Sequence, residues 1–168
     1  MQIDKIKWSG DTVYIEWSEA MPAGPNKYAL DAVQRALPEF YQKFGSLVDH
    51  VVEILELPLS YATGIEARGV HFNYKKDVMG VVITIVKRLP GSKKIFVINT
   101  PHCPETPYGP GKEFAGCLST ECAQVLKELQ LEAELYIQGK RAQLELPLDG
   151  EPPGKKKNIH KLNRASNN

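Results

Sequence analysis

The chain has 168 residues, of which 42% are apolar and 24% are charged, and its formal net charge at pH 7 is +1. This length fits one globular domain with a buried core, and the composition is that of a soluble protein. No apolar run approaches the roughly 18 residues of a membrane span, and the N-terminus lacks the basic and apolar regions of a signal peptide. We therefore predict a cytoplasmic protein without membrane contact.

The first part of the chain predicts a hairpin followed by a helix. Residues 3–7 and 12–17 alternate apolar and polar side chains on either side of a Ser-Gly-Asp turn, which is typical of a β-hairpin. Apolar residues then recur at three or four positions from about residue 30 to residue 57, which predicts helix. Pro38 must interrupt it, so we expect either two helices or one that begins near Pro38.

Three strands are predicted next, at residues 65–74, 78–89 and 94–99, because apolar residues return to alternate positions. The middle strand contains the β-branched run 81–86 and is expected to be buried in the sheet. Residues 100–116 hold four prolines and three glycines, so they cannot form regular structure. A loop of this length predicts a flap or a binding loop.

A final helix is predicted from Ser119 or Thr120, either of which can cap it, to a stop at Gly139. The expected fold is α+β, with an antiparallel sheet of about five strands in the order ββαβββα and with the helices packed on one face. We expect one domain over residues 1–140, a linear motif over 141–150 and a disordered basic tail over 151–168.

The tail carries most of the positive charge of the chain. Residues 151–168 hold five basic side chains and one acidic, a balance of +4, whereas the other 150 residues hold 16 basic and 19 acidic side chains, a balance of −3. Such a tail can contact phosphate or an acidic protein, although a solvated tail without a partner is an equal expectation.

Residues 143–148, Gln-Leu-Glu-Leu-Pro-Leu, follow the last predicted helix. In an extended backbone Leu144, Leu146 and Leu148 leave on one face, which suits docking in an apolar groove. Pro147 has no backbone N–H and is poorly suited to a central strand. The alternative is that these residues form the last edge strand of the domain, which ends at Pro147.

The pattern Gln-Leu-x-Leu-x-Leu resembles the hexapeptide by which bacterial replication and repair proteins bind the sliding clamp, and the Pro147 form is similar to that of the regulatory inactivator of replication initiation. The resemblance covers six residues. It implies that the Gln143 amide binds beside a small pocket, that Leu146 and Leu148 fill a deep apolar one, and that Leu144 makes a lesser contact. The implied partner is the clamp, the beta subunit of the polymerase, in a bacterial host.

The arrangement also resembles small early-region proteins of tailed bacteriophages. The residues that carry this resemblance are an opening hairpin, the Asn-Thr-Pro-His stretch at 99–102 and the Arg-Ala-Gln stretch at 141–143. That family has no defined function, but the resemblance favours a role in phage DNA metabolism. We therefore expect an accessory protein that is recruited to DNA by the clamp or that competes with host clamp partners.

Signals of enzymatic chemistry are few. The chain has no Gly-rich phosphate loop, no His-Glu-x-x-His and no Gly-x-Ser-x-Gly. His102 and Glu105 are the best candidate acid–base pair. Cys103, Cys117 and Cys122 could form a zinc site with His102, but Cys117 and Cys122 do not have the spacing of a CxxC pair, so the signal is weak. The alternative is that the three cysteines are buried thiols without a metal. We expect a non-enzymatic protein that holds neither metal nor cofactor.

The rival interpretation is a single-stranded DNA-binding protein, in which aromatic rings on strands stack on bases while cations follow the backbone. An inhibitor of a host defence or replication protein is a further alternative. The candidate DNA contacts are Trp8, Trp17, Phe72, Tyr74, Lys75, Lys76, Lys155, Lys156 and Lys157, with Lys5, Lys7, Arg68, Lys87 and Arg88 nearby. By alternation several of these rings share the face of Ile3 or Val13 and can instead belong to the core.

Overall fold

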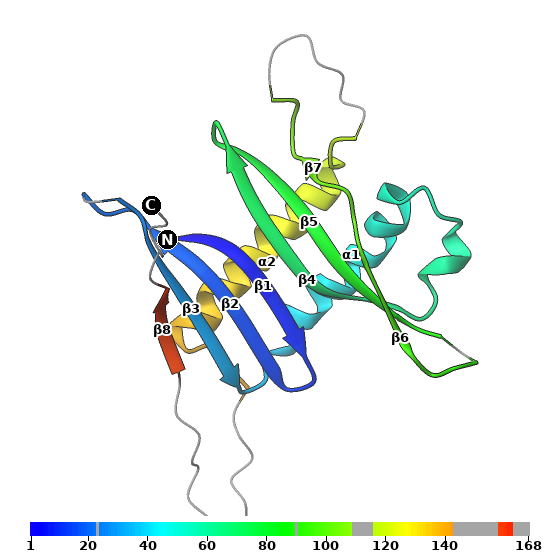
Figure 1. Ribbon diagram of the computed structural model, residues 1–168, viewed down its shortest axis with the longest axis horizontal. Helices are drawn as coiled ribbons and strands as arrows, with labels where there is room; N and C mark the ends of the chain where they lie inside the picture. Colours follow the sequence, from blue (N-terminus) through cyan, green and yellow to red (C-terminus); the bar gives the residue numbers. More distant parts are fainter. Residues whose placement is uncertain (23, 90, 109–115, 143–157, 163–168) are drawn as a thin grey trace, which may run out of the picture.

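The computed structural model describes residues 1–22, 24–89, 91–108, 116–142 and 158–162, which form an antiparallel sheet with two α-helices on one face (Figure 1). The predicted α+β class is confirmed, with more strands than expected. The helices are α1 (Pro38–Ile54) and α2 (Thr120–Gln138), with a short 3-10 helix, η1 (Leu59–Ala62). The strands are β1 (Gln2–Ser9), β2 (Thr12–Glu19), β3 (Asn26–Val33), β4 (Ile65–Lys75), β5 (Val78–Arg88), β6 (Ile95–Asn99), β7 (Cys103–Pro104) and β8 (Asn158–Leu162).

The strands lie in the order β6-β5-β4-β1-β2-β3-β8, and β7 also pairs with β5. The predicted hairpin of β1 and β2 is confirmed and continues into β3 as a meander. The junction between β1 and β4 is short, because only Lys5, Ile6 and Lys7 pair with β4. Beyond Lys7 the two strands separate, and β4 has a register shift between Ala67 and Gly69.

Both α-helices cover the same face of the sheet and lie behind it in Figure 1. Alternate strand residues, such as Ile6, Ile15 and Ile83, point to this side and are fully buried. Phe44 of α1 and Leu126 of α2 pack against them. The opposite face has no helix over it among the described residues, and it carries most of the polar strand residues. In the described part of the chain, no helix is long and apolar enough to cross a membrane.

The expected helix from residue 30 was wrong at its start, because Asn26–Val33 form strand β3. Leu30 and Ala32 do face the core, but their backbone groups pair with β2 instead of forming helical bonds. The helix begins at Pro38, as one of the two expectations had it. For α2, the Ser119 hydroxyl accepts a hydrogen bond from the Cys122 N–H at 3.1 Å, and Gly139 ends the helix with φ of +111°, so both predicted boundaries are confirmed.

Strand β8 lies within the stretch for which the sequence predicted a basic tail. It pairs antiparallel with β3, with Asn158 opposite Asp31 and Leu162 opposite Lys27. Strand β8 therefore covers the outer edge of β3. The sequence pattern of residues 158–162 covers only five positions, and so short a pattern does not distinguish a strand from a polar linker.

Candidate functional site

The end of α2 is tied to the connection between β3 and α1 by a chain of hydrogen bonds. The Tyr136 hydroxyl donates to the Gln34 carbonyl oxygen at 2.5 Å, and the Gln34 side-chain amide donates to the Ala142 carbonyl oxygen at 3.1 Å. The Ala142 N–H donates to the Arg35 carbonyl oxygen at 3.1 Å. The Arg141 guanidinium lies 4.4 Å from the centre of the Tyr136 ring. The backbone is therefore fixed up to the residue before the motif.

The motif residues Gln143, Leu144, Leu146, Pro147 and Leu148 lie outside the described residues, as do Lys155, Lys156 and Lys157. The chain is described again from Asn158, which lies opposite Asp31 near the end of β3. Ala142 is bonded to Arg35, just beyond the same end of β3. The segment that contains the motif therefore starts and finishes at one end of one strand.

Two of the rings predicted to stack on DNA belong to the core. Trp17 is 5% exposed and its ring stacks on that of Tyr28, with ring centres 5.5 Å apart, and Phe72 is 2% exposed. The prediction that Trp17 and Phe72 contact bases was wrong, because alternation turns both toward the helices. Tyr74 is half-buried on the same side, where its hydroxyl oxygen accepts a hydrogen bond from Gln130 of α2.

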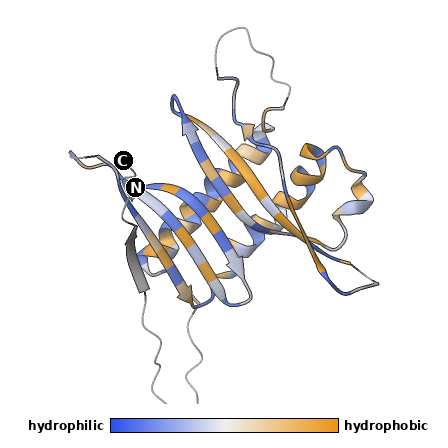
Figure 2. Ribbon diagram, viewed as in Figure 1, coloured by the Kyte–Doolittle hydropathy of each residue, from blue (hydrophilic) through white to orange (hydrophobic). Residues whose placement is uncertain are grey.

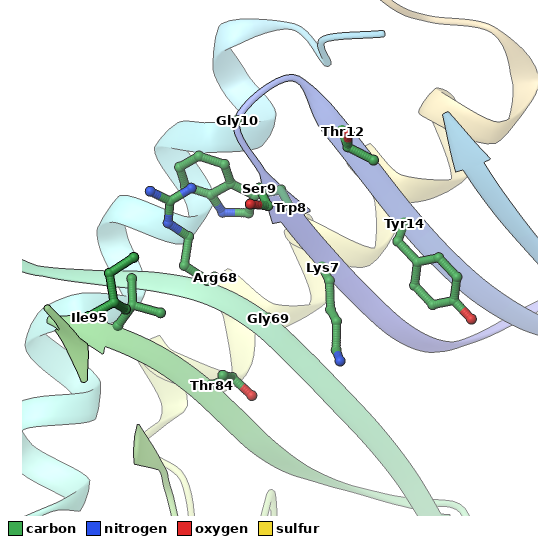
Figure 3. A pocket seen from close by; sticks show the side chains of 11 residues that line it. Lys7, Trp8, Ser9, Gly10, Thr12, Tyr14, Arg68, Gly69, Thr84 and Ile95 are labelled. Atoms are coloured by element: carbon green, nitrogen blue, oxygen red, sulfur yellow. The ribbon is translucent and has the colours of Figure 1, made fainter. Parts of the chain in front are cut away.

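Trp8 lies where β1 and β4 separate (Figure 3). Its ring packs against that of Tyr41 of α1 in a T-shaped arrangement, with ring centres 5.1 Å apart, and its indole N–H donates to the Ala67 carbonyl oxygen at 3.1 Å. The Arg68 guanidinium carbon lies 3.8 Å from the centre of the Trp8 ring. The ring therefore closes the gap in the sheet and holds the guanidinium in place.

A groove of about 380 Å³ opens on the uncovered face at this gap, and we call it the Trp8–Arg68 groove. Its lining includes two cations and no carboxylate among the described residues. Arg68 forms an ion pair with Glu66 through one terminal nitrogen, while its Nε is buried without a hydrogen-bond partner. The lining residues are Lys7, Trp8, Ser9, Gly10, Thr12, Tyr14, Arg68, Gly69, Thr84, Val86 and Ile95.

The carboxylate nearest the groove on β2 is already neutralised. Glu16 accepts hydrogen bonds from the Tyr14 hydroxyl at 2.6 Å and from the Lys5 ammonium at 3.1 Å. Partial burial raises the pKa of Glu16, but the bonds from Tyr14 and Lys5 outweigh it and leave that pKa below its usual value. Burial and the bond to Glu16 raise the pKa of Tyr14 to about 12. This arrangement leaves the positive charge of Lys7 without a carboxylate partner among the described residues.

Of the other predicted DNA contacts, Lys5 lies beside the groove, with its ammonium 5.8 Å from the centre of the Tyr14 ring, whereas Lys75 and Lys76 lie away from it. Lys75 ends β4 and Lys76 begins the turn to β5, at the opposite end of β4 from Arg68, and the Lys75 ammonium lies 5.3 Å from the centre of the Tyr108 ring. The structure therefore brings Trp8, Lys7 and Arg68 together and separates them from Lys75 and Lys76. Sequence reasoning named these residues but missed their grouping, because it depends on where two distant strands part.

The predicted acid–base pair is not assembled. The Nε2 atom of His102 lies 3.3 Å from the Tyr108 hydroxyl oxygen, whereas Glu105 forms an ion pair with Lys127 of α2. Gly80 of β5 makes this placement possible, because a Cβ there would overlap the His102 ring. Each member of the predicted pair has a different partner, so the two do not form a catalytic dyad.

A second cavity, of about 480 Å³, lies beside this loop and is lined by all three cysteines. Burial raises the pKa of the Cys103 thiol, and it raises the pKa of Cys122 to about 12. Among the described residues, no group of three histidine, cysteine or acidic side chains could hold a metal ion. Cys103 and Cys122 are buried side chains of the domain, and Cys117 is partly exposed.

Comparisons with protein-family models, with curated proteins and with solved structures find no match to this chain.

Proposed function

We propose that this chain is a phage-type accessory protein of DNA metabolism that binds the bacterial sliding clamp through residues 143–148. The observation that carries the proposal is the anchoring of the chain on both sides of the motif, at Ala142 and at Asn158. The hydrophobic core of the described domain is made by residues from Ile3 to Tyr136.

Two-ended anchoring favours a short recognition motif energetically. A peptide that buries few side chains binds weakly, because ordering its backbone opposes binding. Closing the segment at both ends removes part of that conformational freedom before the partner arrives. Residues 143–157 number fifteen, so an extended path out and back reaches about 25 Å from the sheet. That distance lets the hexapeptide enter a groove without unfolding the domain.

Replacing Gln143, Leu146 and Leu148 together by Ala should weaken clamp binding by more than about 100-fold. The reason is that two leucine side chains lose roughly 1.5–3 kcal/mol of burial each, and each 1.4 kcal/mol is a tenfold change in affinity. The measurement is titration calorimetry with purified clamp. Leu131→Ala is the matched control, because Leu131 is an exposed leucine of α2 and should leave the affinity unchanged. Equal affinity of the triple variant and the parent would refute the proposal.

A second candidate function is binding of single-stranded DNA in the Trp8–Arg68 groove. The supporting observation is a lining that contains Lys7 and Arg68 without a carboxylate among the described residues. One face of the Arg68 guanidinium lies on Trp8. A base can stack on the other face of a guanidinium, and an ammonium such as that of Lys7 can contact the phosphate. In this candidate the DNA contacts are residues that line the groove on the open face, instead of the buried Trp17 and Phe72 that the sequence suggested.

Lys7→Glu should lower affinity for an oligonucleotide about tenfold and reduce the slope of log affinity against log salt by about one, because one phosphate contact is lost. The measurement is fluorescence anisotropy at two salt concentrations. Lys76→Glu makes the same change of charge at the far end of β4 and should have a much smaller effect. If both variants lose affinity equally, the attraction is general and the groove is not the site.

A further inference from the structure

Strand β6 forms one edge of the sheet and is apolar on both of its faces. Ile95 is 60% exposed, Phe96 is 50% exposed and Val97 is 57% exposed. Among the described residues, β6 pairs only with β5, so its outer side has no partner strand (Figure 1). Figure 2 shows this strand in the hydrophobic colour. Exposed apolar edge strands are templates for pairing with another strand, and soluble proteins usually protect them with charge or proline.

The hydrogen bonds of β6 show which of its backbone groups point outward. The Leu89 N–H donates to the Lys94 carbonyl oxygen at 2.9 Å, and the Thr100 N–H donates to the Ile83 carbonyl oxygen at 2.9 Å. In an antiparallel pair every second residue is hydrogen-bonded, so Phe96 and Ile98 bond to β5. The N–H and C=O groups of Ile95, Val97 and Asn99 therefore point away from the sheet.

We propose that β6 pairs antiparallel with β6 of a second copy of this chain, with Val97 on the two-fold axis. In this register Val97 exchanges two hydrogen bonds with Val97 of the second copy. Ile95 lies opposite Asn99 of the second copy, so every outward backbone group of these residues finds a partner. Phe96 and Ile98 meet on the helix side of the sheet, and the Ile95 and Val97 side chains meet on the open side.

The charges beside β6 favour pairing with β6 of a second copy in the antiparallel direction. Lys93 and Lys94 precede the strand, whereas the uncharged residues Asn99 and Thr100 follow it. An antiparallel pair places Lys94 opposite Thr100, whereas a parallel pair would place like charges side by side at a cost in stability. The strand is thus complementary to itself only in the antiparallel direction. A two-fold pair also stops at two copies, because each copy uses its β6 edge for the other and leaves no β6 edge for a third.

The size of the contact sets the concentration at which pairing should be seen. A pair of five-residue strands with flanking apolar side chains falls at the small end of specific interfaces, below or near about 1,200 Å². We therefore expect a dissociation constant on the order of micromolar to tens of micromolar, which corresponds to about 6–8 kcal/mol. This inference is independent of clamp binding, since the motif segment begins and ends beside β3.

Sedimentation equilibrium of the whole chain between about 5 and 500 μM tests the pairing, and we expect a monomer–dimer equilibrium in that range. Val97→Lys should shift the equilibrium at least tenfold toward monomer, because it places two ammonium groups together on the axis. Leu131→Lys is the matched control, since Leu131 is 59% exposed on α2 and is not part of β6. A parent chain that stays monomeric throughout, or a Val97→Lys variant that dimerises as the parent does, would overturn the proposal.

A cross-linking experiment tests the register independently of the affinity. Residues paired on the axis have Cα atoms about 5.5 Å apart, which a disulfide can bridge, so Val97→Cys should form a covalent dimer on mild oxidation. Phe96→Cys is the control, because its counterpart is then a diagonal neighbour about 7–8 Å away. Mass spectrometry of the dimer distinguishes this bond from any that involves Cys103, Cys117 or Cys122. A Phe96→Cys dimer that forms as fast as the Val97→Cys dimer would exclude the register.

Discussion

Phe44→Ala should lower the free energy of unfolding by about 3–5 kcal/mol, because it removes a fully enclosed ring and leaves a cavity. Phe44 is 1% exposed in the layer where α1 packs on the sheet. Its ring lies 5.5 Å from that of Phe40 and 6.2 Å from that of Trp8, measured between ring centres. Urea denaturation followed by tryptophan fluorescence reports this loss, since Trp8 lies at the same contact.

The control for this prediction is the exposed Leu131→Ala, which should change stability by less than about 0.5 kcal/mol. Because Phe44 holds α1 against the tip of the β1–β2 hairpin, its removal should also loosen the Trp8–Arg68 groove. A Phe44→Ala variant that is as stable as the parent would mean that α1 does not pack on Trp8 as described.

The protein should lose several kcal/mol of stability as the pH rises from about 9 to about 12. Burial raises the pKa of Tyr136 and of Cys122 to about 12 in the folded chain. The unfolded chain releases these protons near pH 10 and near pH 8.5. Above those values the folded state binds more protons than the unfolded state, so stability falls with rising pH until the folded groups titrate. Tyr136 alone accounts for about 3 kcal/mol across two pKa units.

Urea unfolding followed by circular dichroism at pH 8, 9.5 and 11 measures this decline. Tyr136→Phe should flatten the part above pH 10, although it also removes the hydrogen bond to the Gln34 carbonyl oxygen and costs about 1 kcal/mol at pH 8. Cys122→Ala should remove the decline between pH 9 and 10 and make the decline above pH 10 less steep, because the folded chain holds the Cys122 proton up to about pH 12. A stability that stays constant to pH 11 would show that neither group is buried in its neutral form.

Features that depend on neighbouring residues were the ones that the sequence predicted well. The turn at Gly10, the cap at Ser119 and the stop at Gly139 each follow from local backbone chemistry, and the structure has them where they were expected. Strand β3 was missed, because residues 26–33 fit a helical and a strand period equally. Hydrogen bonds to β2 stabilise the strand over the helix, and the local sequence pattern does not predict these bonds.

In the candidate sites too, the sequence predicted local features but not those that depend on distant residues. The residue types of the Trp8–Arg68 groove were recognised, but their grouping required Trp8 of the first hairpin to reach Ala67 of β4, 59 residues further along the chain. The anchoring of Ala142 on Arg35 also joins distant parts of the sequence. Alternation alone could have placed Trp17 in the core, since it shares a face with Val13 and Ile15. The long-range pairing of strands thus determines both sites.

The position of β8 has a consequence for synthesis on the ribosome. Strand β3 emerges early and β8 is translated only after both α-helices, so the outer edge of β3 stays bare while most of the domain folds. An uncovered edge in a nascent chain is where neighbouring polypeptides on a polysome can join by mistake. Fast translation or early binding by a chaperone at Lys27 to Asp31 would therefore increase the yield of correctly folded protein.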